Sequence, residues 1–197
     1  MTILGGSAVA AFVSWMAYET GDHFAWHPFL MSVGPLAVSA ASIYAIRTRK
    51  AISKPKGRIW RVKIHSFLFN LATLMMAGGF YAIYTFKSSK GKEHYTSWHS
   101  WLGLAALVLM LASWVTAMLN TVDVQGRRLR WLWFSRNHRW LGIAAYVVSL
   151  GAVITGFRSN WGVYKFGRTG TWALTAEVLI VGCGVLLLGI ARKKNNQ

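Results

Sequence analysis

Acidic residues are scarce in this 197-residue chain, which has five Asp and Glu against 22 Lys and Arg. Charged residues of both signs make up only 14% of the sequence, whereas hydrophobic residues make up 54% and the mean hydropathy is +0.37. Soluble domains carry a much larger charged fraction. The composition therefore excludes an ordinary globular protein and indicates an integral membrane protein.

Cysteine and the common catalytic motifs are also scarce or missing. The single cysteine, Cys183, excludes an intrachain disulfide. The sequence contains no Walker loop, no HExxH zinc motif, no GxSxG elbow and no dinucleotide-binding fingerprint. Any chemistry must therefore depend on residues in the membrane helices and at their ends.

Six apolar segments are present instead, each close to the roughly 20 residues that a spanning helix requires. They cover about residues 2–18, 27–46, 64–86, 99–119, 139–157 and 172–191. We interpret the first, and shortest, as a helix and not as a signal peptide, because no Lys or Arg precedes it. No connection is long enough to separate domains. We therefore expect one all-α membrane domain over residues 1–197, with the second to fifth helices forming a four-helix bundle.

The basic residues predict how this bundle is oriented. Most of them lie on one side of the predicted helices, in the segments 47–63, 127–139 and 192–194. Short loops rich in Lys and Arg stay cytoplasmic, so we expect both termini in the cytoplasm. Because the net charge of +17 is distributed beside the helices, it favours contact with anionic lipids of the bilayer and argues against nucleic acid as a partner.

Four of the six histidines open successive helices, at His27, His65, His99 and His138. Ionisable residues in membrane helices are costly and are functional by default. Since successive helices alternate in direction, His27 and His99 are expected at the outer face and His65 and His138 at the inner face. Two neutral imidazoles on opposing helices are what six-coordinate haem iron needs. The topology therefore predicts two haem sites, one at each face.

Glycines follow three of these histidines at helical spacing. Gly103 and Gly142 come one turn after the histidines of HSWLG and HRWLG, and Gly34 comes two turns after His27. A residue without a side chain lets a flat macrocycle approach the helix backbone. Glycine is also a common packing residue between membrane helices, so the repeated pentad is a stronger signal than any one glycine.

Together these motifs resemble the cytochrome b561 family of six-helix di-haem transmembrane oxidoreductases. The resemblance covers about residues 26–157, the expected haem-binding core. It depends on WHPFLM at Trp26–Met31 followed by Gly34 and Arg47, on RVKIH before the third helix, on HSWLG, and on NHRWLGIAAYVVSLGAVITG. The chain is similar to the members that consist of this domain alone, without an attached extracellular module.

The resemblance implies that His27 and His99 ligate an outer haem b and that His65 and His138 ligate an inner one. It also implies that electrons pass from cytoplasmic ascorbate to monodehydroascorbate or a ferric chelate on the far side of an endomembrane or vesicle membrane. Candidate substrate residues are Arg47, Arg61 and Lys63 on the cytoplasmic side and Lys92, His94 and Tyr95 on the outer side. Val62 occupies a position where the family usually has lysine.

Two other functions are compatible with the same helices. A cytochrome b membrane subunit that exchanges electrons with a redox partner and quinone would also carry paired histidines. A transporter could use histidines as proton relays or metal ligands, although two histidines at each face are too few for a tight zinc site. The sequence is also compatible with a homodimer.

Overall fold

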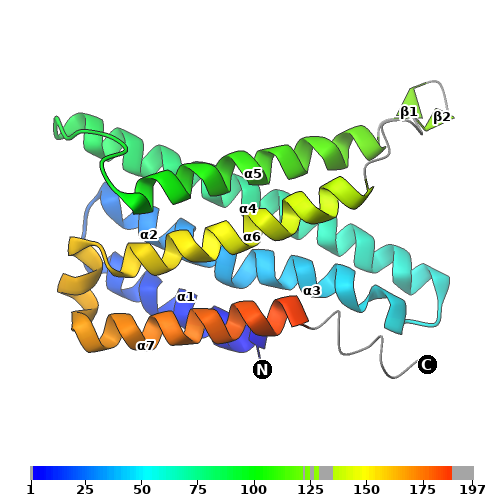
Figure 1. Ribbon diagram of the computed structural model, residues 1–197, viewed down its shortest axis with the longest axis horizontal. Coiled ribbons are helices and arrows are strands. Elements are labelled where there is room, and N and C mark those ends of the chain that lie inside the picture. The colour runs from blue at the N-terminus through cyan, green and yellow to red at the C-terminus, as the bar shows by residue number, and fades with distance from the viewer. Residues whose placement is uncertain (1, 122, 125–126, 129–134, 188–197) are drawn as a thin grey trace.

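The computed structural model describes residues 2–121, 123–124, 127–128 and 135–187. Helices account for nearly all of this part of the chain (Figure 1). They are α1 (Thr2–Tyr18), η1 (His23–Ala25), α2 (Trp26–Val33), η2 (Gly34–Ser39), α3 (Ala40–Thr48), η3 (Arg49–Ala51), α4 (Pro55–Ser89), α5 (Trp98–Thr121), α6 (Ser135–Phe157) and α7 (Asn160–Leu187). Two short strands, β1 (Asp123–Val124) and β2 (Arg127–Arg128), pair antiparallel between α5 and α6.

The all-α membrane architecture predicted from the sequence is confirmed. Five helical stretches are long and apolar enough to cross a membrane, and a shorter apolar helix precedes them at Ile3–Tyr18. The five stretches are His23–Ala51, Pro55–Ser89, Trp98–Met118, Asn137–Phe157 and Asn160–Leu187. The chain is therefore an integral membrane protein of about six helices.

The stretch His23–Ala51 combines α2 and α3 with the π-helical segment η2 between them. Pro35 lies in this segment and has no backbone N–H to donate to the preceding turn. A π-helical turn holds more residues than an α-helical turn, and such turns are often found at functional sites. The span therefore contains an additional residue without being broken.

Helix α4 is longer than a membrane span. Its 35 residues extend about 52 Å, against a hydrocarbon layer of about 30 Å. The excess lies before His65, where Ile59 and Trp60 are 57% and 63% exposed and the Lys63 Nζ lies 5.5 Å from the centre of the Trp60 ring. Mixed Trp and Lys side chains are typical of the membrane–water interface.

The last helix begins earlier than predicted. We expected a helix over 172–191, but α7 starts at Asn160 and bends at Gly167, where φ is +67°. Lys165 and Arg168 concealed this start because they interrupt the apolar pattern, whereas the bend at Gly167 allows the helix to continue in a new direction. Residues 188–191 lie outside the described part of the chain.

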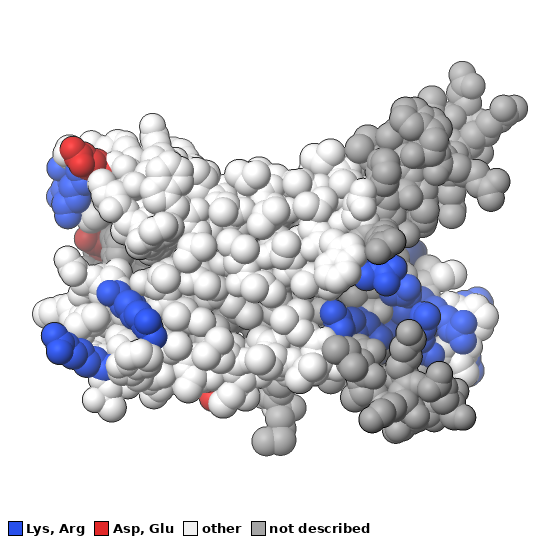
Figure 2. All heavy atoms as spheres, in the orientation of Figure 1, with Lys and Arg blue, Asp and Glu red and all other residues white. Residues whose placement is uncertain are grey.

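The helices form two hairpins with a third layer beside them (Figure 1). The α2–η2–α3 span packs against α4, α5 packs against α6, and α1 and α7 pack on each other and on the span and α6. Lys and Arg gather at two ends of the molecule on the face shown in Figure 2, and the band between them is almost uncharged. We call the end that carries the α3–α4 connection, with Lys50, Lys54, Lys56 and Arg58, the basic end.

Candidate functional site

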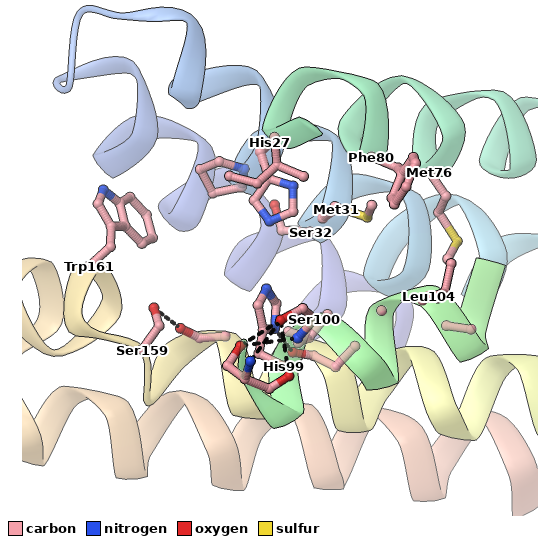
Figure 3. Close-up of a pocket in the computed structure, with 18 of the residues that line it drawn as sticks. His27, Met31, Ser32, Met76, Phe80, His99, Ser100, Leu104, Ser159 and Trp161 are labelled. Atoms are coloured by element: carbon pink, nitrogen blue, oxygen red, sulfur yellow. Dashed lines mark hydrogen bonds between the residues drawn. The ribbon is translucent and has the colours of Figure 1, made fainter. Parts of the chain in front are cut away.

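The four helix-opening histidines form two pairs, one towards each end of the bundle. The rings of His27 on α2 and His99 on α5 have centres 5.9 Å apart and are inclined at 79°. The rings of His65 on α4 and His138 on α6 have centres 6.2 Å apart and are inclined at 76°. Figure 3 shows His27 and His99 on opposite sides of a cavity. The structure thus brings together the partners expected from the alternating helix directions.

A backbone carbonyl of a neighbouring helix orients each of these rings. The Nδ1 atoms of His27, His65, His99 and His138 lie 3.0, 3.0, 2.9 and 3.0 Å from the carbonyl oxygens of Gly79, Ser42, Ala152 and Ser113, respectively. A carbonyl oxygen only accepts hydrogen bonds, so Nδ1 carries the proton in all four rings. Nε2 keeps a free lone pair, which is the form in which neutral imidazole binds a metal.

Each of these helices carries one histidine of a pair and, further along, the residue whose carbonyl accepts the hydrogen bond from the histidine of the neighbouring helix. The spacing between these two positions on one helix repeats. Fourteen residues separate them on α4 (65 and 79), on α5 (99 and 113) and on α6 (138 and 152), whereas fifteen separate 27 from 42 on the α2–η2–α3 span. The span with one residue more is the one that contains the π-helical segment. Because a π turn accommodates an extra residue, η2 keeps His27 and Ser42 on the same side of the span.

The distance between the paired rings fits a single metal ion. A metal–imidazole bond of about 2.0 Å on each side, with about 1.1 Å from a ring nitrogen to the ring centre, places two centres about 6 Å apart. Among the described residues, no group of three or more His, Cys, Asp or Glu is placed to hold a metal. Two ligands alone do not make a structural zinc site. The donor set fits an iron whose other four ligands come from a macrocycle.

A cavity of about 510 Å³ lies between His27 and His99 (Figure 3). Most of its lining is apolar and comes from α2, α4, α5 and α6, including Met31, Met76 and Leu104. This volume is within the range of pockets that bind small organic ligands and cofactors. A flat macrocycle carried by the two imidazoles would lie in this space.

The three predicted glycines have different surroundings. Gly103 lines the cavity, and a Cβ added there would meet no atom within 4 Å. A Cβ on Gly142 would lie 3.5 Å from the Ser113 Oγ, and a Cβ on Gly34 would lie 3.4 Å from the Met76 Cγ. The space beside Gly103 thus belongs to the cavity, whereas Gly142 and Gly34 lie against side chains of α5 and α4, at distances that an added Cβ would meet as ordinary van der Waals contacts.

Sequence reasoning missed one glycine that contacts a histidine. A Cβ on Gly156 of α6 would lie 3.1 Å from the Cε1 of His99. Gly156 follows Ala152, the carbonyl acceptor of His99, by one helical turn. The absence of a side chain at this position therefore gives the His99 ring the room it needs to reach that carbonyl.

The His65–His138 pair has aromatic and polar surroundings. The Phe69 ring centre lies 6.1 Å from that of His65 and 6.3 Å from that of His138. Asn70, the next residue of α4, accepts a 2.7 Å hydrogen bond from the Trp114 indole of α5. This bond joins the two hairpins beside the pair.

The three candidate substrate residues at the basic end have separate contacts. Arg47 donates a 2.7 Å hydrogen bond to the Leu186 carbonyl and so ties α3 to α7. Arg61 is half-buried and lies on α4 one turn before His65. Lys63 is exposed beside Trp60. Arg61 therefore lies on the same face of α4 as His65.

Two of the three candidates at the opposite end line the cavity. His94 stacks on Tyr84 with ring centres 4.4 Å apart and lies 3.2 Å from the Ser88 Oγ. Tyr95 has a left-handed backbone with φ of +56°, and both residues contribute to the cavity wall. Lys92 instead places its Nζ 5.9 Å from the centre of the Phe86 ring.

Lys87 also lines this cavity, and the sequence analysis did not identify it as a site residue. Among the described residues that line the cavity, it is the only Lys, Arg, Asp or Glu. Its Nζ donates a 3.0 Å hydrogen bond to the Glu93 carbonyl, which ties α4 to the α4–α5 loop. A helical spacing could have revealed it, since it lies two turns after Gly79 and hence on the same face of α4.

The family model described as eukaryotic cytochrome b561 matches residues 26–162. The chain is 29% identical over 119 residues to the lysosomal membrane ascorbate-dependent ferrireductase CYB561A3 of Mus musculus, covering 56% of this chain and 48% of the relative. It is 27% identical over 123 residues to the transmembrane ascorbate-dependent reductase CYB561 of Sus scrofa, covering 59% and 47%.

The transmembrane reductase CYB561D2 of Bos taurus is 28% identical over 97 residues, which cover 49% of this chain and 44% of that protein. The matches span about half the length of these curated relatives. All four histidines of the two pairs lie within the segment that the family model matches.

Proposed function

Because the chain belongs to the cytochrome b561 family, we propose that it is a transmembrane oxidoreductase with two haem b groups. His27 and His99 hold one group, and His65 and His138 hold the other. The observation that supports this most directly is the common arrangement of the four imidazoles, each with Nδ1 bonded to a carbonyl and each facing a partner ring about 6 Å away. Haem b is the cofactor that family membership implies, and when bound it supplies reversible one-electron chemistry.

The residues between the two pairs keep the interior dry. A buried cluster of Ala72, Met76, Ala106, Leu107, Met110 and Ala145 lies between them on α4, α5 and α6. Fourteen residues along each of these helices correspond to a separation of about 21 Å between the pairs. Excluding water from this interval lowers the local polarity, which helps to set reduction potentials.

The donor side is assigned to the basic end. Loops rich in Lys and Arg stay in the cytoplasm, which puts both termini and the His65–His138 pair on that side. The ascorbate named in the descriptions of the relatives is an anion near neutral pH, and Arg61 offers it a guanidinium one turn from His65. Arg47 and Lys63 are the other two cationic candidates.

The acceptor side is assigned to the opposite end. Lys87, His94 and Tyr95 line the cavity that also contains His27 and His99, and Lys92 lies on the same α4–α5 loop as His94 and Tyr95. These groups can hydrogen-bond an oxygen-rich acceptor such as monodehydroascorbate or a ferric chelate. The lysosomal relative suggests an endomembrane as the site of the reaction.

Sealed vesicles provide the test of this function. The protein is reconstituted with a ferric chelate inside, and ascorbate is then added outside. We expect ferrous iron to form inside at a rate that His65→Ala and His99→Ala each abolish. A haem-containing protein that ascorbate does not reduce but a quinol does would refute the ascorbate assignment and support a quinone-linked cytochrome b instead.

A further inference from the structure

The two histidine pairs differ in the hydrogen bonds at Nδ1. At the basic end, each Nδ1 lies near a serine hydroxyl as well as a carbonyl. The Ser42 Oγ is 2.9 Å from Nδ1 of His65, and the Ser113 Oγ is 3.3 Å from Nδ1 of His138. At the opposite end, the carbonyls of Gly79 and Ala152 belong to residues that have no hydroxyl. The difference applies to both members of each pair.

The direction of the Ser42 bond follows from its other contact. The Ser42 hydroxyl donates to the His65 carbonyl at 3.0 Å, so its lone pairs are free to accept the Nδ1 proton of the same residue. Ser113 is fully buried, and its hydroxyl lies beside Gly142 of α6 as well as beside His138. At the basic end, each Nδ1 proton therefore has two acceptors on one serine, its carbonyl and its hydroxyl.

We propose that the hydroxyls of Ser42 and Ser113 make His65 and His138 stronger electron donors than His27 and His99, and so lower the reduction potential of the haem at the basic end. This inference rests on the proposed function. Hydrogen bonds accepted from Nδ1–H raise the basicity of an imidazole ligand, and such bonds are among the factors that set haem potentials. A stronger donor stabilises the ferric state, which has one positive charge more than the ferrous state.

A lower potential at the basic end favours transfer of one electron from that end to the His27–His99 end. The cations of the basic end act in the opposite sense, because nearby positive charge favours the reduced state. The serine effect is therefore measured by comparing variants and not by comparing the two ends of the native protein.

The test is a redox titration of the haem-loaded protein, followed by absorbance. Removal of either hydroxyl in Ser42→Ala or Ser113→Ala should raise the potential of one of two haems. We expect a change of roughly threefold in its reduced-to-oxidised ratio at fixed ambient potential. The double variant should show about a tenfold change, or ~59 mV for a one-electron couple. The other haem should keep its potential.

Controls distinguish tuning from damage to the fold. Ser14→Ala removes a hydroxyl that donates to Ala10 within α1 and should change neither potential. Ser42→Thr keeps a hydroxyl and should restore the native value. Unchanged potentials in a double variant that retains both haems would refute the serine role alone. A native protein without haem would refute the proposed function as well, so the two failures are distinguishable.

Discussion

Each imidazole of the two pairs is fixed by a carbonyl of the helix beside it, and this bond determines which nitrogen is free. The bonds run within hairpins, between α2 and α4 and between α3 and α4 in one, and between α5 and α6 in the other. The facing rings come from different hairpins. A metal held between them would therefore link the hairpins, and each hairpin would orient its own two histidines beforehand.

Gly156 is the residue at which a single methyl group should disturb this arrangement. Its added Cβ would lie 3.1 Å from the His99 ring, whereas an added Cβ on Gly151 of the same helix would lie 3.9 Å from its nearest neighbour, Leu102. We expect Gly156→Ala to displace His99 and lower haem occupancy to about one per chain, and Gly151→Ala to leave it unchanged. The measurement is the haem content per chain of each variant. Equal haem contents in Gly156→Ala and Gly151→Ala would contradict the steric role of Gly156.

At the scale of helices, η2 compensates for one extra residue. The histidine-to-acceptor spacing is fifteen residues in the span that contains η2 and fourteen in α4, α5 and α6. Deleting Ala37 from η2 would give this span the spacing of the others and allow a regular α-helix. We therefore expect the Ala37 deletion to retain both histidine pairs and both haems.

The matched control is a deletion in a helix that has no π-helical turn. Removing Ala112 from α5 reduces the spacing between His99 and Ser113 to thirteen residues and rotates one end of the helix relative to the other by about 100°. That variant should lose at least one haem, as seen in the absorbance spectrum. A protein that tolerates the Ala112 deletion but not the Ala37 deletion would show that η2 has another role.

Much of this arrangement was predictable at the scale of helices. Apolar length located the spans except for the start of α7, and the alternation of direction predicted that His27 would face His99 and that His65 would face His138. The positions of Gly156, Ser42 and Ser113 beside the rings were not predictable, because they depend on how far each helix is rotated about its axis. These helices are apolar on most sides, so the sequence pattern does not define that rotation.

At the scale of the whole molecule, charge and polarity are separated along the helix axes. Lys and Arg lie at the ends, and the interval between the two histidine pairs is lined by buried Ala, Leu and Met. Such a molecule can carry a redox change across a membrane without a water-filled path. If the two pairs act in this way, the protein binds two haems per chain, each dependent on its own pair of histidines.

The most direct measurement is therefore the haem content per chain of the purified protein and of four variants. We predict two haems in the native protein, about one in His99→Ala and in His138→Ala, and none in the double variant. His23→Ala, which changes an exposed residue outside both pairs, should retain two. A native protein with one haem, or single variants that keep both, would contradict the two-pair account.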